Sequence, residues 1–543
     1  MTNFEIVQSE FGPIKGFHKQ LALNNNCVAF QNVPYMKAPI RNLRFREAQP
    51  TEKWQEPLDA TSDIIGYCSF NHFKEVEGKE DAGILNIFTK NLKPKKLCPV
   101  MVWIHGGGFI IGSSSTDIYG PDYFLQEDIV FVSINYRLGV FGFLSLDDKS
   151  LNIPGNNGLK DQIFALKWIK KNIANFGGDP NNITIFGESA GGASVHFLCI
   201  TEQSKGLFQK AIIMSGSALC KTWGLIPQST SRKHTEILAE KLGFSGNKSD
   251  QKSLLQFLEK APAEDIVKAT EEILTLEDKY CFAFHSPFVP VIEPYKTKNC
   301  FVPKDPLELM KTCWTNKIDI LFTGNSIEGI IRKIEPLETG IQIFNKNPSY
   351  ALPLIELQAD PSDQHIQELG LKIKNLYFNG KWDDRESFLR LSSELMFWNP
   401  VYRTIQSRIK HAKGKTYLVR FDAEGGRNFL KEFYQSTEYK GASHGDELFY
   451  IFENAIFDRL ETNSNDFKIM KQYVGILTNF AIKSSPNSEE IEPLKLKELT
   501  DPNKIMCLQI TEKGTSIVEL PESEKLKVWS TLYKDSKVFR SKL

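Results

Sequence analysis

Short apolar runs alternate with helix-like segments along the first 220 residues. The runs 99–104 (PVMVWI), 129–136 (IVFVSINY) and 183–186 (ITIF) have the continuous apolar character of strands that are buried on both faces. Between the last two runs, residues 159–176 carry apolar side chains at helical spacing, namely Ile163, Leu166, Ile169, Ile173 and Phe176. Buried strands separated by amphipathic helices predict an α/β fold, with a mostly parallel central sheet covered by helices on both faces.

The middle of the chain has a different pattern. Two segments, within residues 222–315 and 330–412, are polar, helix-patterned and rich in Lys and Glu. The strand-like run 318–324 (IDILFTG) lies between the two segments, and the run 416–425 (TYLVRFDAEG) follows the second. Helical insertions of this kind commonly cap the site of an α/β sheet, so we expect a single domain over residues 1–543 with two cap insertions. The C-terminal tail is charged, contains prolines and ends in an amphipathic helix-like stretch, SEKLKVWSTLYKD.

The composition narrows the class of protein. Lys and Arg number 66, Asp and Glu also number 66, and the pI is near 7.1, so we expect no nucleic-acid partner. The most apolar window, 97–112, is too short and too rich in glycine to span a membrane, so we expect no stable membrane insertion. Residues 1–17 contain no long apolar run and do not read as a secretory signal. The nine cysteines lack paired spacing, which predicts neither a disulfide framework nor a metal site.

One serine stands between glycines in TIFGESAGGAS, residues 184–194. The GxSxG pattern around Ser189 is weak on its own, because a pattern with three fixed positions recurs by chance in long chains. Here a strand-like run precedes it and a helix-like stretch follows it, which is the context of a nucleophilic serine on a strand–turn–helix elbow. Glycines at the crowded positions would permit that strained turn. Ser189 is therefore the candidate nucleophile.

A second glycine-rich stretch, HGGGF at 105–109, follows the strand-like run 99–104 directly. Glycines let the backbone approach a substrate closely and turn its amides toward the oxygen on which negative charge develops. A lone GGG would be read as a flexible turn. At a strand end and upstream of the GxSxG serine, it is better interpreted as an oxyanion hole.

A nucleophilic serine in this type of fold requires an acid and then a histidine later in the chain. Of the nine histidines, His444 lies in a glycine- and serine-rich loop, GASHGDELFY, beyond a late strand, and is the best candidate base by position. For the acid, Glu328 follows the strand-like run 318–324 in GNSIEG, while Asp422 and Glu424 are rivals by loop position.

For the histidines outside these motifs, we expect packing or solvent exposure rather than catalysis. His196 is expected to pack on the helix after the serine, and His285 to line a pocket or fill the core. The others stand among charged residues and are expected to be solvated, namely His18, His72, His234, His365 and His411.

These motifs together resemble the type-B carboxylesterase/cholinesterase family of α/β-hydrolases, and within it the insect α-esterase type of intracellular carboxylesterase. The resemblance covers nearly the whole chain through the motifs LRFREAQP, WIHGGGF, NYRLGVFGFL, GNNGLKDQIFALKWIKKNIANFGGDP, FGESAGG, GLFQKAIIMSGSAL and GASHGDELFY. It implies the α/β-hydrolase fold with helical cap insertions.

The family pattern also implies roles for individual residues. The implied triad is Ser189 as nucleophile, Glu328 as acid and His444 as base. The implied oxyanion-hole amides are those of Gly107, Gly108 and Ala190. Glu328 is chosen over its two rivals because GNSIEG matches the acid–glycine motif of the family. Glu188 is expected to lie near the base and to help stabilise its imidazolium form, and no cofactor or metal ion is required.

The resemblance implies a serine carboxylesterase that hydrolyses small-molecule esters through an acyl-enzyme and is inhibited by organophosphates. Xenobiotic or lipophilic esters and a detoxifying role are expected. A competing hypothesis is a juvenile hormone esterase-like hydrolase of hormone or pheromone esters, although those enzymes typically have Gln where Glu188 stands. The family pattern also leaves open a low-turnover protein that sequesters esters or organophosphates, a non-catalytic binding protein, and a true lipase.

Two departures bear on location and substrate. Secreted relatives carry EDCLYLN where this chain has EDAGILN (80–86), so Cys68 lacks its expected disulfide partner and an intracellular protein is expected. The segment 69–81 has no Trp, so the choline-binding Trp of cholinesterases is missing. The chain ends in Ser541-Lys542-Leu543, which matches the address read by the peroxisomal import receptor. We therefore expect a cytoplasmic or peroxisomal location rather than secretion.

Overall fold

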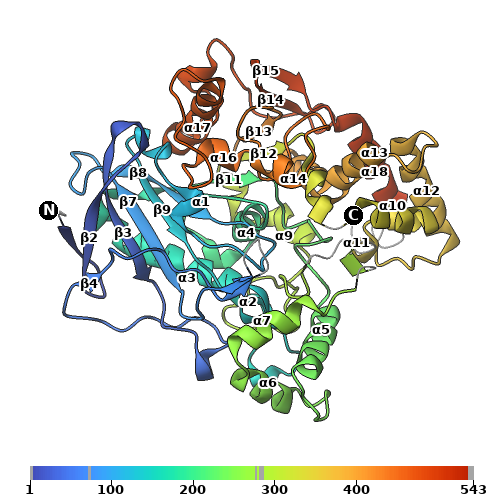
Figure 1. Ribbon diagram of the computed structural model, residues 1–543, viewed down its shortest axis with the longest axis horizontal. Helices are drawn as coiled ribbons and strands as arrows, with labels where there is room; N and C mark the ends of the chain where they lie inside the picture. The colour runs from blue at the N-terminus through green and yellow to red at the C-terminus, as the bar shows by residue number, and fades with distance from the viewer. Residues whose placement is uncertain (1–3, 71–74, 276–277, 280–285, 335, 536–543) are drawn as a thin grey trace.

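The computed structural model describes residues 4–70, 75–275, 278–279, 286–334 and 336–535 (Figure 1). The C-terminal Ser541-Lys542-Leu543, as well as His72 and His285, lie outside these residues.

A large sheet forms the centre of the molecule. Its strands, in chain order, are β1 (Phe4–Gln8), β2 (Pro13–Gln20), β3 (Asn26–Pro34), β4 (Leu58–Asp59), β7 (Ile84–Thr89), β8 (Cys98–Ile104), β9 (Val130–Ile134), β10 (Gly178–Glu188), β11 (Lys210–Met214), β12 (Ile320–Asn325), β13 (Thr416–Phe421), β14 (Met506–Thr511) and β15 (Gly514–Glu519). Their order across the sheet is β1-β2-β3-β7-β9-β8-β10-β11-β12-β13-β14-β15, and β4 pairs with β2. A separate short hairpin consists of β5 (Ser69–Phe70) and β6 (Val76–Glu77).

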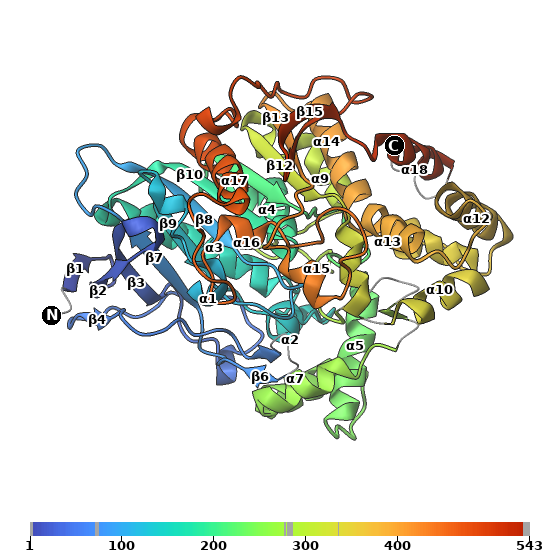
Figure 2. The same cartoon turned by 45° about the horizontal axis from the view of Figure 1, so that its top comes forward.

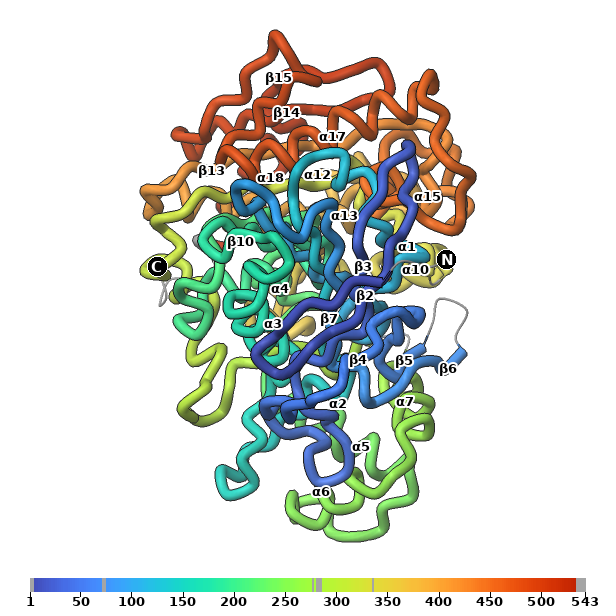
Figure 3. Tube along the Cα trace, turned by 90° about the vertical axis from the view of Figure 1, so that its left-hand side faces the viewer, coloured from blue at the N-terminus to red at the C-terminus, as the bar shows by residue number. Residues whose placement is uncertain are grey.

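The strands from β9 to β14 run parallel, while the strands at both edges are antiparallel. Figure 3 looks onto the N-terminal edge, where β2 and β3 lie, with β13, β14 and β15 at the top of the view. The parallel centre matters for function because the carboxyl ends of parallel strands meet at one edge of a sheet, where loops can assemble a site.

Helices connect and cover these strands. They are α1 (Thr116–Tyr119), α2 (Gly139–Phe143), α3 (Asn157–Asn172), α4 (Ala190–Ile200), α5 (Gln228–Lys241), α6 (Gln251–Lys260), α7 (Ala263–Glu271), α9 (Pro306–Thr312), α10 (Leu337–Lys346), α11 (Leu354–Leu357), α12 (Gln364–Phe378), α13 (Arg385–Ser393), α14 (Asn399–His411), α15 (Phe429–Phe433), α16 (Leu448–Ile451), α17 (Asn465–Lys483) and α18 (Ser523–Asp535).

Alternating side chains of the central strands pack into two separate cores. On β8, Val100, Val102 and Ile104 share one core with residues of α3 and α4. Met101 and Trp103, which point to the opposite face, share the other core with residues of α16 and α17. This burial on both faces confirms the predicted layers and explains why the strand sequence is continuously apolar.

The helices of the chain's middle lie away from the central sheet in two groups. Helices α5, α6 and α7 form one group at the lower edge of Figures 1 and 2, and α10, α12 and α13 form another beside α18. By contrast, α9 packs on α4, and α14 packs on α9 and β13. The pair β14 and β15, within the charged tail, was not anticipated from the sequence.

Candidate active site

Ser189 occupies a strained turn between β10 and α4. Its φ of 58° and ψ of −120° lie in a region that residues with a side chain rarely adopt. A Cβ on Gly187 would come within 2.5 Å of the Ile104 carbonyl oxygen, and one on Gly191 within 2.0 Å of the same atom. The two glycines are therefore required by close packing against the end of β8, as the elbow interpretation of the sequence expected.

The structure brings His444 and Glu328 together. Nδ1 of His444 lies 2.6 Å from Oε2 of Glu328, and both side chains are buried. Glu328 begins the short 3₁₀ turn η8 (Glu328–Ile334), just beyond β12. Its other oxygen accepts hydrogen bonds from the Ser215 hydroxyl at 2.6 Å and the Asn325 amide at 2.7 Å. The carboxylate is therefore fixed at both oxygens and holds the imidazole in one orientation.

The two rival acids have different partners. Asp422 pairs with Arg420 at 2.8 Å. Glu424 accepts a hydrogen bond from the Gly441 amide at 2.5 Å and pairs with Lys431 at 3.3 Å. Both residues follow β13, the strand next to β12.

Asp446 holds the loop that carries His444. Its carboxylate accepts hydrogen bonds from the amides of Ser443 at 2.7 Å, Leu430 at 2.9 Å and Lys431 at 3.2 Å. Burial raises the pKa of Asp446 to about 6, and the amide hydrogen bonds act in the opposite direction.

Glu188 lies against the other ring nitrogen of His444. Its Oε1 is 3.1 Å from Nε2, so the imidazole stands between two glutamates. Burial and the neighbouring Glu328 carboxylate raise the pKa of Glu188 well above its usual value. Glu188 therefore lies near His444, as we expected from the family resemblance.

A third buried glutamate was not anticipated from the sequence. Glu447 receives a hydrogen bond from the side-chain amide of Asn325, which also donates to the Ser443 carbonyl at 2.6 Å. Burial, Glu188 and Glu328 raise the pKa of Glu447 well above its usual value. Its position three residues after His444 in GASHGDELFY was the available signal.

The glycine loop packs against the Ser189 elbow. A Cβ on Gly106 would lie 3.2 Å from Cβ of Ser189. Gly107 has φ of 98° and Gly108 has φ of 61°, and the Gly107 carbonyl accepts hydrogen bonds from the amides of Ile110 and Ile111, both at 3.0 Å. Within the part of the chain that the structure describes, the amides of Gly107 and Gly108 donate to no protein group. The loop is thus held by its carbonyl, which leaves both amides available to an anion.

Ala190 completes the set of predicted oxyanion donors. It is the first residue of α4, where an amide has no acceptor within the helix. The helix dipole adds partial positive charge at this end, which favours an anionic oxygen there.

Aromatic rings cover the site. Phe397, on the π-helical turn η10 (Glu394–Trp398), packs against His444 with 4.3 Å between ring centroids and 33° between the ring planes. His105 stacks on Tyr136 at 4.5 Å, and burial lowers the pKa of His105 to about 4, which keeps it neutral. Neither contact was anticipated, because each joins segments that are distant in sequence.

The other histidines lie away from this arrangement. His196 is buried on α4, with its Nδ1 3.1 Å from the Ser217 hydroxyl oxygen. The expectation that His234 is solvated is wrong: it is buried, and its Nδ1 lies 2.8 Å from the Pro287 carbonyl oxygen. His18, His365 and His411 are at least partly exposed.

Two further kinds of site are absent from the described residues. Within those ranges, no group of three or more His, Cys, Asp or Glu side chains is arranged to hold a metal ion. No helix there is long and apolar enough to cross a membrane.

The parallel sheet with helices on both faces and a serine on a strand–turn–helix elbow define the α/β-hydrolase class. The chain belongs to the carboxylesterase family, whose sequence model matches residues 3–529. It is therefore a carboxylic ester hydrolase.

Comparison with individual esterases supports this family membership. The chain is 34% identical to Esterase B1 of Culex pipiens over 98% of its own length and 99% of that protein. It is 32% identical to the juvenile hormone esterase of Tribolium castaneum, over 88% of this chain and 84% of that protein. Among solved structures it is similar to the juvenile hormone esterase of Manduca sexta with OTFP covalently attached. That comparison has a TM-score of 0.85 and 26% identity, and it covers 98% of this chain and 100% of that one.

Proposed function

We propose that this enzyme hydrolyses esters with Ser189 as nucleophile, His444 as general base and Glu328 as the acid that orients it. The observation that carries the proposal is the 2.6 Å contact between Oε2 of Glu328 and Nδ1 of His444, which leaves Nε2 on the opposite side of the ring. That nitrogen lies 3.1 Å from Glu188, the residue directly before Ser189. A buried imidazole with one nitrogen fixed by a carboxylate, and the other beside the residue that directly precedes Ser189, is suited to accept a serine proton.

The chemistry would proceed by two acyl transfers. Nε2 of His444 takes the hydroxyl proton of Ser189 as its oxygen attacks the ester carbonyl, and the carbonyl π electrons move onto the oxygen. The amides of Gly107, Gly108 and Ala190 would stabilise that oxyanion. As the tetrahedral state collapses, the C–O bond of the alcohol breaks and His444 protonates the leaving oxygen. Water then attacks the acyl-enzyme by the same steps, which releases the carboxylic acid and restores the serine.

We further propose that the substrates are xenobiotic or lipophilic esters and that the role is detoxification. Similarity to Esterase B1 and Esterase E4 supports a general esterase. Similarity to two juvenile hormone esterases supports the hormone-ester hypothesis, but not more strongly than the first two relatives support a general esterase. Organophosphates should inhibit by phosphorylating Ser189, because the adduct resembles the tetrahedral state and would hydrolyse slowly.

The test is hydrolysis of 1-naphthyl acetate and p-nitrophenyl butyrate by wild type, Ser189→Ala and His444→Asn. Both variants should lose about 10³-fold or more in kcat. Two controls remove the same groups elsewhere. They are Ser530→Ala, whose hydroxyl donates to the Leu526 carbonyl within α18, and His196→Asn, a buried histidine that contacts Ser217. The proposal fails if the Ser189 variant keeps its activity, or if the controls lose as much.

We also propose an intracellular location. All eight cysteines among the described residues are free, including Cys68, and Ala82 is buried where secreted relatives would supply its partner. Use of Ser541-Lys542-Leu543 as a peroxisomal address stays a prediction. A fluorescent protein that ends in the last twelve residues should enter peroxisomes, and the same fusion without Leu543 should stay diffuse. A diffuse distribution of both fusions would leave the cytoplasm as the location.

A further inference from the structure

The backbone that leads to the candidate base is held largely by side chains. All six peptide groups of residues 441–443 are hydrogen-bonded, and five of them bind a side chain. Some of these partners lie in residues 325–327, which directly precede the candidate acid Glu328. We call residues 325–328 the acid loop and residues 441–444, which end in His444, the base loop.

Three contacts join the acid loop to the base loop. The Ser326 hydroxyl oxygen accepts the Ala442 amide at 2.8 Å. The Ile327 amide donates to the Ala442 carbonyl at 3.0 Å. The Asn325 side-chain amide donates to the Ser443 carbonyl at 2.6 Å. We call these three contacts the loop clamp, and two of them are made by side chains.

Asn325 also binds the acid itself. Its backbone amide donates to Oε1 of Glu328 at 2.7 Å, and its carbonyl accepts the indole N–H of Trp398 at 2.9 Å. Its side-chain amide donates to Glu447 as well as to the base loop. Asn325 is fully buried, so loss of its side-chain donor would leave buried acceptors without that partner. One residue therefore fixes the acid and the base loop together.

The two loops are in tight contact at Gly441. Its φ is 107°, and a Cβ at this position would stand 2.3 Å from Oγ of Ser326. Glycine therefore permits the approach that the loop clamp requires. The same approach sets the 2.6 Å contact between Glu328 and His444. Misplacement of a reacting group by about 1 Å can cost on the order of 10²-fold in rate.

We propose that Asn325 and Ser326 are positioning residues for ester hydrolysis, because their side chains hold the base loop where His444 meets Glu328. This proposal rests on the proposed function, since both residues act through the pair of His444 and Glu328. It adds two residues to the account of the site, and neither of them touches the ester.

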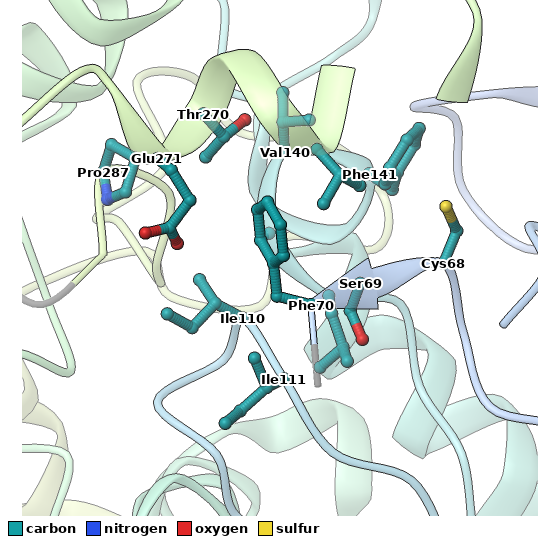
Figure 4. Close-up of a pocket in the computed structure, with 13 residues that line it drawn as sticks. Cys68, Ser69, Phe70, Ile110, Ile111, Val140, Phe141, Thr270, Glu271 and Pro287 are labelled. Carbon is teal, nitrogen blue, oxygen red and sulfur yellow. The ribbon is translucent and has the colours of Figure 1, made fainter. Parts of the chain in front are cut away.

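The pocket drawn in Figure 4 lies apart from the loop clamp. Its lining includes Phe70, Ile111 and Glu271, and no residue of the acid loop or the base loop belongs to it. Substitutions in the loop clamp leave this lining unchanged. We therefore expect them to lower kcat rather than to raise KM.

The first test removes the two side-chain contacts of the loop clamp one at a time. Asn325→Leu removes the donor and keeps a similar size, while Ser326→Ala removes only the acceptor of the Ala442 amide. With p-nitrophenyl butyrate, kcat should fall by about tenfold or more in the first variant and about threefold or more in the second. KM should stay within about twofold in both. Ser326→Ala carries the test if Asn325→Leu does not fold.

Two matched controls remove the same groups from other buried positions. Asn172 accepts the Glu10 amide at 2.8 Å and donates to the Trp168 carbonyl at 2.9 Å. The Ser9 hydroxyl oxygen accepts the Gly12 amide at 3.2 Å. Asn172→Leu and Ser9→Ala should keep kcat within about twofold of wild type. Equal losses of kcat in the clamp variants and the controls would overturn the proposal.

A second measurement separates positioning from a general loss of structure. In Glu328→Gln the carboxylate that orients the imidazole is gone, so each clamp substitution should lower kcat by less than about twofold in that background. Equal fold-losses with and without the Glu328 carboxylate, or wild-type kcat in the folded clamp variants, would contradict the positioning role and leave the proposed function intact. Ser189→Ala gives the blank rate, and wild-type activity in that variant would overturn the proposed function itself.

Discussion

The Glu188 carboxyl lies 3.1 Å from Nε2 of His444, on the side of the imidazole opposite Glu328. This nitrogen receives the serine proton in the proposed mechanism, so a carboxylate beside it would stabilise the imidazolium as it forms. Since Glu188 directly precedes Ser189, the nucleophile's own strand supplies this group.

Glu188→Gln should therefore lower kcat by about tenfold, which corresponds to about 1.4 kcal/mol of transition-state stabilisation. KM should change little, because the interaction strengthens only as the imidazolium forms. Steady-state kinetics with p-nitrophenyl butyrate measure both values. Glu394→Gln removes another buried carboxyl and is the control. Unchanged turnover in Glu188→Gln would show that Glu188 does not stabilise the imidazolium form of His444.

Lys431 and Glu424 together hold the peptide groups of Gly441, three residues before His444. Lys431 Nζ donates to the Gly441 carbonyl at 2.9 Å, while Glu424 accepts from the Gly441 amide at 2.5 Å. Lys431→Met should lower kcat by about fivefold with little change in KM, because the base would be less well positioned. Lys160→Met removes a similarly buried lysine, paired with Glu47 and Glu293, and should leave kcat unchanged. Equal losses in both variants would indicate a general cost of losing a buried cation.

Glu394 predicts a pH dependence of stability. Burial raises its pKa to about 8, while an unfolded glutamate titrates near about 4.3. Between these values the folded chain binds more protons than the unfolded chain, so this group's contribution to the free energy of unfolding falls as the pH rises through 8. Glu394→Gln keeps an acceptor for Tyr377 without the charge, so it should match the wild-type melting temperature at pH 5 and exceed it near pH 8.5.

The control for that experiment is Glu386→Gln, whose carboxyl is half exposed and paired with Arg390. It should show the same small difference from wild type at both pH values. If Glu394→Gln also differs from wild type by the same amount at pH 5 and pH 8.5, folding does not raise the pKa of Glu394.

Sequestration and catalysis predict different progress curves. With excess p-nitrophenyl butyrate, a catalytic esterase should release p-nitrophenol through many turnovers per active site, since water can attack the acyl-enzyme. A sequestering protein would release about one equivalent and then stop. The ratio of released p-nitrophenol to the concentration of active sites distinguishes catalysis from sequestration.

The sequence predicted the elements whose patterns are local. The runs around Val100 and Ile185 and the periodic stretch around Ile169 became β8, β10 and α3, because strands buried on both faces and amphipathic helices carry strong patterns. Strand β14 and the edge strand β15 were not predicted, because neither is fully buried and both lie in a charged tail. The TEKG stretch between them was a readable turn signal.

The candidate site was only partly predictable for a related reason. Three acids follow neighbouring strands, and from the residues alone Glu328 could not be separated from Asp422 and Glu424. The choice depends on which carboxylate faces His444, which is a property of sheet order and loop path. Phe397 and Glu447 approach the imidazole and its neighbouring carboxylates through tertiary packing, which no local pattern encodes.

The most direct measurement is covalent labelling of the nucleophile. The enzyme is incubated with diethyl p-nitrophenyl phosphate, p-nitrophenol is counted, and the modified peptide is identified by mass spectrometry. The proposed mechanism predicts about one equivalent of p-nitrophenol, complete loss of esterase activity, and a diethylphosphoryl group on Ser189 in the GESAG stretch. Labelling of another residue with loss of activity, or full activity after Ser189 is labelled, would contradict it.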